Sequence, residues 1–254
     1  MKIVVCVKQV VDTEATISLN GDSIDWGTSP MVLNPFDEYG VEAALQLKDS
    51  LSAEVIALTV SADSEVEALR RALAMGADSA VQIVHDTAAQ LDSLSTAKLI
   101  AAAIVHIGEV DMVIFGRQTI DMGSGVTQAQ TARTLRWPML GYIGRITVSG
   151  NTLNCDRILE EEKIQVEADL PAVLSIVQAI GEPRYPSFIG IKRAQKAEIQ
   201  KIPANRLATL KSKIDHSSYA LPAPKTNACQ MITGENMQDT AKIVLAKLRE
   251  AKAL

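Results

Sequence analysis

Along the first 140 residues, the apolar positions follow two different periods in turn. Short, nearly continuous apolar runs predict strands buried on both faces, at residues 3–7, 54–60, 80–84 and 111–115. Apolar residues with helical spacing predict helices from residue 35 onward, at 63–75, at 94–107 and in the stretch that ends at 135. Strands that alternate with helices of this length form right-handed βαβ crossovers and a parallel sheet. Ligands of such sheets bind at the carboxyl ends of the strands, so residues that follow strands are the candidates for chemistry.

The pattern changes at residue 143. Two runs around Ser149-Gly150-Asn151 predict a hairpin of residues 143–148 and 152–159. Residues 163–168 and 172–178 predict two further strands, residues 180–230 predict irregular structure, and residues 237–251 predict an amphipathic helix. An irregular arm that ends in a helix packs either on a partner or on its own domain, and the pattern leaves both open.

The composition is that of a soluble globular protein, with 47% hydrophobic and 22% charged residues among 254. The net charge of −5 argues against a nucleic-acid binder. No run of residues approaches the roughly 20 apolar positions of a transmembrane helix, and the N-terminal run is too short for a signal peptide. We therefore expect a cytoplasmic protein without a transmembrane segment.

The cysteines and histidines show no recognisable site. Cys6, Cys155 and Cys229 form no Cys-x-x-Cys pair, which argues against a disulfide framework and against a zinc site. The histidines at 85, 106 and 216 are too scattered for a metal motif or a catalytic triad. We therefore predict no metal and no catalytic residue.

The loop after the fourth predicted strand has the composition of a phosphate-binding loop. Glycine and serine occur between Gly116 and Thr127, directly before a helix. Glycine allows the backbone to approach a ligand closely, and the N–H groups at a helix start favour an anion. The loop is neither a Walker A sequence nor a GxGxxG sequence. The pattern alone favours a simpler interpretation, a helix preceded by a flexible loop.

Two further segments follow the first strand. Asn34 and Pro35 are typical of an N-cap and a first helical residue, so they predict a helix start, with Phe36 either in the core or at a site. Lys8 and Asp12 follow the first strand and, on the simplest interpretation, are solvated.

Five segments occur together in one order: CVKQVVDT at 6–13, LNPFDEYGVEAALQLKD at 33–49, LRRALAMGAD at 69–78, GRQTID at 116–121 and GEPRYPS at 181–187. Through these segments, and over nearly its whole length, the chain resembles the beta subunits of electron-transfer flavoproteins. The resemblance implies a doubly wound, Rossmann-like parallel α/β fold, similar to the adenine-nucleotide alpha-hydrolases, with a C-terminal arm. It implies a nucleotide-binding domain of residues 1–200, which includes the hairpin and a docking loop at 182–192. Residues 201–254 would then form an arm and a helix that pack on the alpha subunit.

The resemblance also implies sites, residue by residue. The adenosine of a nucleotide would lie among Cys6, Val7, Lys8, Asn34 and Val60, and its phosphate against Gly116, Gln118, Asp121, Gly123, Ser124, Gly125, Val126 and Thr127. Phe36, and Thr13 where relatives have Tyr, would face FAD held by the alpha subunit. Glu182, Pro183, Arg184, Tyr185 and Phe188 would dock onto partner dehydrogenases.

The chain departs from the family pattern in two places. The family loop has an acid at 123 and Gln at 126, where this chain has Gly123 and Val126. Relatives favour an acid followed by two glycines where this chain has three glutamates at 160–162. Backbone contacts to a phosphate survive such changes and side-chain contacts do not, so the resemblance leaves the identity of the nucleotide open.

The resemblance implies an electron carrier rather than a stand-alone enzyme. It would take electrons from dehydrogenases such as acyl-CoA dehydrogenases, in fatty acid oxidation, and pass them to a quinone oxidoreductase, with AMP bound structurally in the beta subunit. The alternative is a subunit of a flavin-based electron-bifurcating complex, whose beta site holds a second FAD that accepts hydride from NADH. A third interpretation, a nucleotide-binding regulatory domain of the same fold, does not account for the arm after residue 180.

Overall fold

The computed structural model of the chain describes residues 1–21, 23–208, 210, 213–214, 219–221, 223 and 229–253. They fall into two compact units, Met1–Tyr219 and Ala220–Leu254. His216, one of the three histidines for which we predicted no metal or triad role, lies outside the described residues. The predicted domain boundary at residue 200 and the packing of residues 201–254 on a partner remain predictions.

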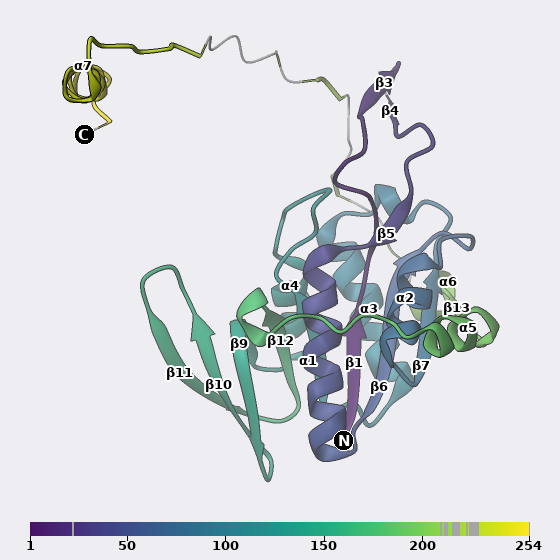
Figure 1. The fold of residues 1–254 in the computed structure, drawn as a ribbon. Coiled ribbons are helices and arrows are strands. Elements are labelled where there is room, and N and C mark those ends of the chain that lie inside the picture. The colour runs from purple at the N-terminus through teal and green to yellow at the C-terminus, as the bar shows by residue number, and fades with distance from the viewer. Residues whose placement is uncertain are drawn as a thin grey trace. The chain divides into compact units, whose positions relative to one another are not determined.

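The first unit is built on one sheet with nine strands among the described residues (Figure 1). Its parallel centre has the spatial order β7 (Ser79–Val84), β6 (Glu54–Ser61), β1 (Lys2–Cys6), β8 (Met112–Gly116) and β12 (Ala172–Ile176). When these five strands are numbered by their order along the chain, they lie in the sheet as 3-2-1-4-5. The direction of winding therefore reverses between β1 and β8. The prediction of a doubly wound, Rossmann-like parallel sheet is confirmed.

Helices cover both faces of the sheet, as the nearly continuous apolar strands require. One face packs against α1 (Pro35–Leu51) and α2 (Glu67–Met75) in the cluster that includes Leu45 and Leu69. The other face packs against α3 (Ser93–Ile107) and α4 (Thr127–Leu135) in the cluster that includes Leu99 and Ala132. Helix α1 follows β1 on one face and α4 follows β8 on the other, and this divergence makes the β1–β8 boundary the place for a ligand.

Strands at the two edges complete the sheet. The predicted hairpin is confirmed as β9 (Met139–Ser149) and β10 (Thr152–Ile158), followed by β11 (Lys163–Asp169). At the other edge, β13 (Gln200–Pro203) pairs with β7. A pair formed by β2 (Gln9–Val11) and β5 (Met31–Leu33) follows β1 and leads to a short hairpin of β3 (Ser18–Asn20) and β4 (Ser23–Asp25).

The prediction of irregular structure throughout 180–230 is wrong for its first part. A 3-10 turn (η2, Gln178–Ile180) leads to α5 (Phe188–Lys196), β13 and α6 (Ala204–Leu207). Only Ala194 of α5 is buried, so the helix has too few apolar contacts for a clear helical period in the sequence. Another 3-10 turn, η1 (Ala88–Gln90), precedes α3.

The second unit contains α7 (Met237–Glu250), which confirms the predicted terminal helix. Its first turn is capped by the side chain of Asn236, which accepts a hydrogen bond from the N–H of Asp239 at 3.0 Å. The apolar residues of α7 are not buried within this chain.

Candidate nucleotide site at the carboxyl ends of the strands

The predicted nucleotide-site residues lie together where β1, β6 and β8 end and where α1 and α4 begin, in the upper part of Figure 1. Val7 continues from β1 and donates its N–H to the carbonyl of Leu58 in β6 at 2.9 Å. Cys6 and Val7 have buried side chains, so they can offer a ligand only their backbone. Val60 is half-buried near the end of β6. Phe36 is half-buried and Thr13 is exposed.

Asn34 has a different role from the one that its position predicts. It precedes α1 and Pro35 is the first helical residue, but its side chain makes no capping hydrogen bond. The fully buried amide instead donates from Nδ2 to the carbonyl of Gln118 at 2.8 Å, and Oδ1 accepts from the N–H of Ile120 at 3.2 Å. Asn34 therefore holds the loop after β8 against the start of α1.

An ion pair joins the two sides of the site at its surface. The ammonium group of Lys8, after β1, lies against the carboxylate of Asp121 in the loop after β8. Burial works to raise the pKa of Asp121, but the charge and hydrogen bond of Lys8 hold the pKa below its ordinary value. Lys8 is therefore engaged with the loop rather than simply solvated.

Glycine at position 116 allows the start of α1 to approach the end of β8. A Cβ atom at Gly116 would lie 2.6 Å from the carbonyl group of Phe36 and 2.5 Å from Oδ1 of Asp37. A Cβ atom at Gly40, on the facing side of α1, would lie 3.4 Å from the backbone of β8, which is an ordinary contact. Gly116 is thus required by the close approach, independently of any ligand.

The loop that starts at Arg117 turns back on itself before α4. Gly123 and Gly125 have φ values of +61° and +58°, in the left-handed region that favours glycine. Gln128, the second residue of α4, donates from Nε2 to the carbonyls of Arg117 at 3.1 Å and Gly125 at 2.7 Å. The first turn of α4 has no side-chain cap, so its N–H groups can meet an anion.

Asp37 is a central residue of this site that the sequence pattern did not single out. Its buried carboxylate accepts hydrogen bonds from the N–H of Lys8 at 2.9 Å and from the N–H of Gly116. It therefore connects the ends of β1 and β8 to the first turn of α1. An acid in the first turn after Asn-Pro was the available signal, but such acids are common at helix starts.

We expect Asp37 to make the protein less stable as the pH rises. Burial raises the pKa of this carboxyl from its ordinary 3.8 to about 7, against the opposing hydrogen bonds from Asn34, Lys8 and Gly116. Between these values the folded chain binds a proton that the unfolded chain has released, so the free energy of unfolding falls as the pH increases. From pH 5.5 to 7 the loss is about 1.6 kcal/mol, because the slope of about 1.4 kcal/mol per pH unit falls to half as the pH reaches the pKa of the folded state.

Urea unfolding at several pH values checks this expectation. Asp37→Asn should lower stability, because an amide cannot accept from both N–H groups, and it should flatten the pH dependence between 5.5 and 7. Parallel pH profiles for the two proteins would contradict the assignment of a raised pKa to Asp37.

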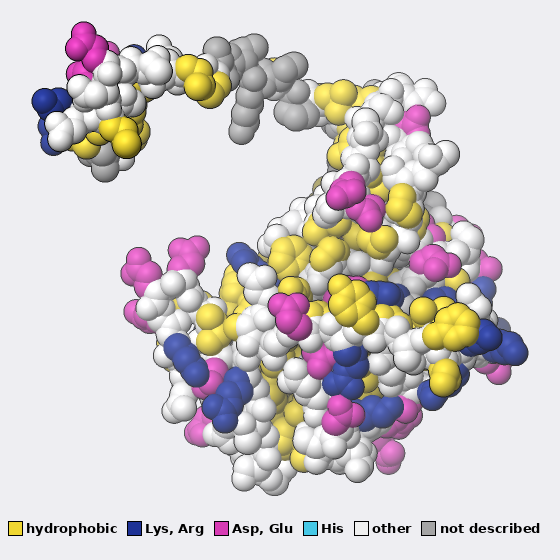
Figure 2. All heavy atoms as spheres, viewed as in Figure 1, with side chains coloured by type: hydrophobic (Ala, Val, Ile, Leu, Met, Phe, Trp, Pro, Cys, Tyr) yellow, Lys and Arg dark blue, Asp and Glu magenta, His cyan; other side chains and the backbone are white. Residues whose placement is uncertain are grey.

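The predicted docking residues lie elsewhere, on the segment that crosses α1 toward α5 (Figure 1). Tyr185 and Phe188 are exposed, whereas the guanidinium group of Arg184 is engaged by acids of α1. Figure 2 shows apolar side chains beside Lys and Arg at the α5 end of this face. The structure therefore places the predicted docking residues apart from the predicted nucleotide-site residues.

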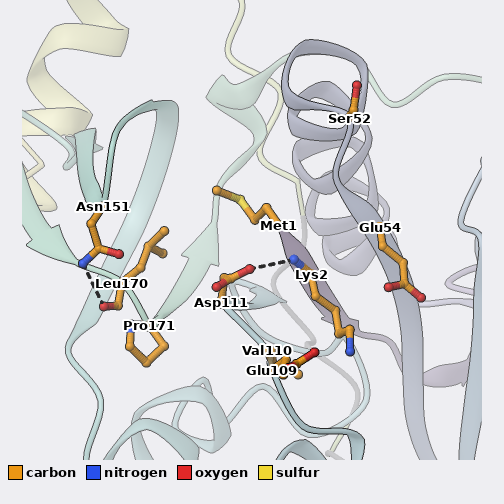
Figure 3. Close-up of a pocket in the computed structure, with 10 residues that line it drawn as sticks. All are labelled: Met1, Lys2, Ser52, Glu54, Glu109, Val110, Asp111, Asn151, Leu170 and Pro171. Carbon is orange, nitrogen blue, oxygen red and sulfur yellow. Dashed lines mark hydrogen bonds between the residues drawn. The ribbon is translucent and has the colours of Figure 1, made fainter.

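A surface hollow of about 650 Å³ lies at the opposite ends of the strands (Figure 3). Its lining includes Lys2, whose N–H donates to Asp111 at 2.8 Å, and Asn151, which donates to the carbonyl of Leu170 at 3.3 Å. None of the predicted site residues lines this hollow.

Over the described residues, neither a metal-binding group nor a membrane-spanning helix is found. Their His, Cys, Asp and Glu side chains form no cluster of three or more that could hold an ion. None of their helices combines the length and hydropathy needed to cross a bilayer.

Comparisons with known proteins agree on one family. The model of the electron transfer flavoprotein domain matches residues 27–207. An electron transfer flavoprotein subunit beta of Syntrophomonas wolfei is 33% identical, over 98% of this chain and 95% of its own. The corresponding subunit of Bacillus subtilis is 29% identical over the whole of both chains. The caffeyl-CoA reductase-Etf complex subunit CarD of Acetobacterium woodii is 32% identical over 98% of both chains.

Proposed function

We propose that this chain, which belongs to the electron transfer flavoprotein family and matches its beta subunits, works in a cytoplasmic heterodimer with an alpha subunit. The heterodimer takes electrons from flavin dehydrogenases, such as the acyl-CoA dehydrogenases of fatty acid oxidation. It passes them to a quinone oxidoreductase. FAD is held mainly by the alpha subunit and supplies the redox chemistry.

The observation that supports a bound nucleotide best is the start of α4. Its first turn has no side-chain cap, and it follows a loop with two glycines of positive φ. This loop is held in place by Asn34, Lys8 and Gln128. A preorganised row of backbone N–H groups is suited to the phosphate of AMP, since no side-chain anion occupies the helix start.

Each group of site residues has a separate part in this proposal. The backbone from Ser124 to Thr127 holds the phosphate, and the backbone at Cys6 and Val7 lies beside the adenosine. Lys8 and Asp121 close the site from the surface. Phe36 and Thr13 face the FAD of the alpha subunit. AMP in this site is structural, so no proton or electron passes through these residues.

A second candidate function is that of a subunit in an electron-bifurcating complex, with a second FAD in the beta site. The similarity to a subunit of a caffeyl-CoA reductase-Etf complex favours it. Gly123 also leaves open space, because a Cβ atom built there would have no neighbour closer than 4.0 Å. A ligand larger than AMP therefore meets no side chain at this point of the loop.

We expect the purified heterodimer to contain one FAD and one AMP, and the beta chain expressed alone to contain no flavin. Absorbance of the released flavin and chromatography of the released nucleotides measure both ratios. A heterodimer with two FAD molecules and no AMP would contradict the carrier function and support the bifurcating function. An isolated beta chain that binds FAD tightly would contradict the division of labour between the subunits.

A further inference from the structure

A polar face of α1 is in contact with the segment that leads to the predicted docking residues. Glu42, Gln46 and Asp49 follow one another at helical spacing on this face. Gln46 donates from Nε2 to the carbonyl of Ile180 at 3.3 Å, at the start of the segment. The segment then crosses α1 (Figure 1), and the two acids of this face bind Arg184.

Arg184 is held by a fork of charged hydrogen bonds. Its Nε and Nη2 atoms donate to the two carboxylate oxygens of Glu42 at 2.9 and 3.0 Å, and its backbone N–H donates to the same carboxylate at 3.1 Å. Its Nη1 atom donates to Asp49 at 3.0 Å. The bidentate geometry fixes the orientation of the guanidinium plane as well as its position.

Glu42 is only 5% exposed, so this carboxylate depends on its partner. Burial works to raise the pKa of Glu42, but hydrogen bonds and charge from Arg184 hold the pKa below its ordinary value. The hydrogen bonds that Arg184 donates to Glu42 raise the pKa of Arg184. Both groups therefore stay charged, and removal of one partner leaves an uncompensated charge in a largely buried place.

The residues that follow Arg184 are fixed again where α5 begins. Ser187 caps α5 by accepting from the N–H of Gly190 at 3.0 Å. A Cβ atom at Gly190 would lie 2.5 Å from the carbonyl oxygen of Ala74, so α5 sits tightly on the end of α2. Between these fixed points, the side chains of Tyr185 and Phe188 are 90% and 71% exposed.

We propose that Arg184 is a positioning residue that acts inside the chain: its fork with Glu42 and Asp49 holds Tyr185 and Phe188 in the orientation for docking. This inference rests on the proposed function, in which the segment 182–192 docks onto a dehydrogenase. Tyr185 and Phe188 then contact the partner, and Arg184 does not. Because the fork orders the segment before the encounter, less conformational entropy is lost on binding.

A spin label tests the positioning in the heterodimer without any partner. Tyr185→Cys provides the labelling site in a Cys229→Ser background, because Cys6 and Cys155 are buried. We expect Arg184→Gln to sharpen the spectrum of the label markedly and Arg184→Lys, which keeps the charge but not the fork, to sharpen it less. The matched control is Arg193→Gln, at an exposed position of α5, which should leave the spectrum unchanged.

Steady-state reduction of the unlabelled heterodimer, by an acyl-CoA dehydrogenase and its acyl-CoA, tests the consequence. We expect Arg184→Gln to raise the apparent KM for the heterodimer by roughly tenfold, equivalent to about 1.4 kcal/mol, with kcat and flavin content unchanged. The apparent KM of Arg184→Lys should lie between those of the wild type and Arg184→Gln. Arg184→Lys replaces Arg184→Gln in both measurements if Arg184→Gln folds poorly.

The outcomes separate the inference from the proposed function. If Arg184→Gln raises KM but leaves the label spectrum unchanged, Arg184 contacts the dehydrogenase directly. If it sharpens the spectrum but leaves KM unchanged, order in the segment is irrelevant to docking. Either result overturns the positioning role. A wild-type heterodimer that the dehydrogenase does not reduce would overturn the proposed function, while the label spectra would still decide whether Arg184 holds the segment.

Discussion

A Gly125→Glu heterodimer is expected to lose the nucleotide of the beta site, with an affinity about a hundredfold lower. The residue lies two positions before α4, and its φ of +58° costs a side-chain-bearing residue about 1–2 kcal/mol. The new carboxylate also competes for the N–H groups of the helix start and repels a phosphate there, by up to about 2 kcal/mol. The free loop relieves the strain by leaving the binding conformation, so binding has to restore it. Together the two effects amount to about 3 kcal/mol, which corresponds to about a hundredfold in affinity.

Gly150→Glu is the matched control for this loss. Gly150 has a φ of +60° in the turn between β9 and β10, with nothing within 4 Å of a Cβ atom built there. The same substitution therefore adds the same charge and similar backbone strain away from the site. The measurement is the ratio of nucleotide to alpha-subunit flavin after purification. Full nucleotide content in Gly125→Glu would place the phosphate elsewhere.

The parallel centre of the sheet could be predicted from the sequence because its strands are buried on both faces. The run at 54–60 gave β6 to within one residue, and the run at 3–7 gave β1 to within one residue at each end. A fully buried strand leaves a continuous apolar signal that does not depend on distant residues. The alternation with helices then determined the fold class.

The elements after residue 180 could not be predicted in the same way. Helix α5 buries only Ala194, and β13 has four residues at a sheet edge, of which Ile202 is buried. Their positions depend on contacts with distant parts of the chain, such as the hydrogen bonds from Arg70 to the carbonyls of Ala194 and Ala197. A local pattern contains no information on such contacts.

The candidate site likewise has local features that the sequence predicts and long-range contacts that it does not. Glycines, a helix start and strand ends are local features, so the sequence located them. The partners of Asn34 and Arg184 are not local, because one residue contacts a loop 84 positions away and the other a helix 142 positions away. The pattern predicted an N-cap at Asn34 and the resemblance implied a docking contact at Arg184, but neither could identify these intrachain partners.

We expect Gly116→Ala to destabilise the first unit by about 3 kcal/mol, near the upper end of the usual cost of overpacking. The added Cβ atom would meet backbone atoms of Phe36 at 2.6 Å, and a backbone cannot move aside as a flexible side chain can. Helix α1 would have to shift, which weakens the hydrogen bonds of Asp37 to both strand ends. In a thermal melt the midpoint should fall by roughly 6–12 °C, at 2–4 °C per kcal/mol for a unit of this size.

Gly40→Ala tests the same helix–strand contact from the opposite side. Its Cβ atom would lie 3.4 Å from the backbone of β8 and 3.5 Å from Ile114, within ordinary contact, and alanine favours the helix over glycine by about 1 kcal/mol. We therefore expect Gly40→Ala to leave the melting temperature unchanged or to raise it slightly. Equal melting temperatures for the two variants would show that α1 can move away from β8 at little cost. Gly116 would then be at the site for the sake of a ligand rather than for the packing of α1.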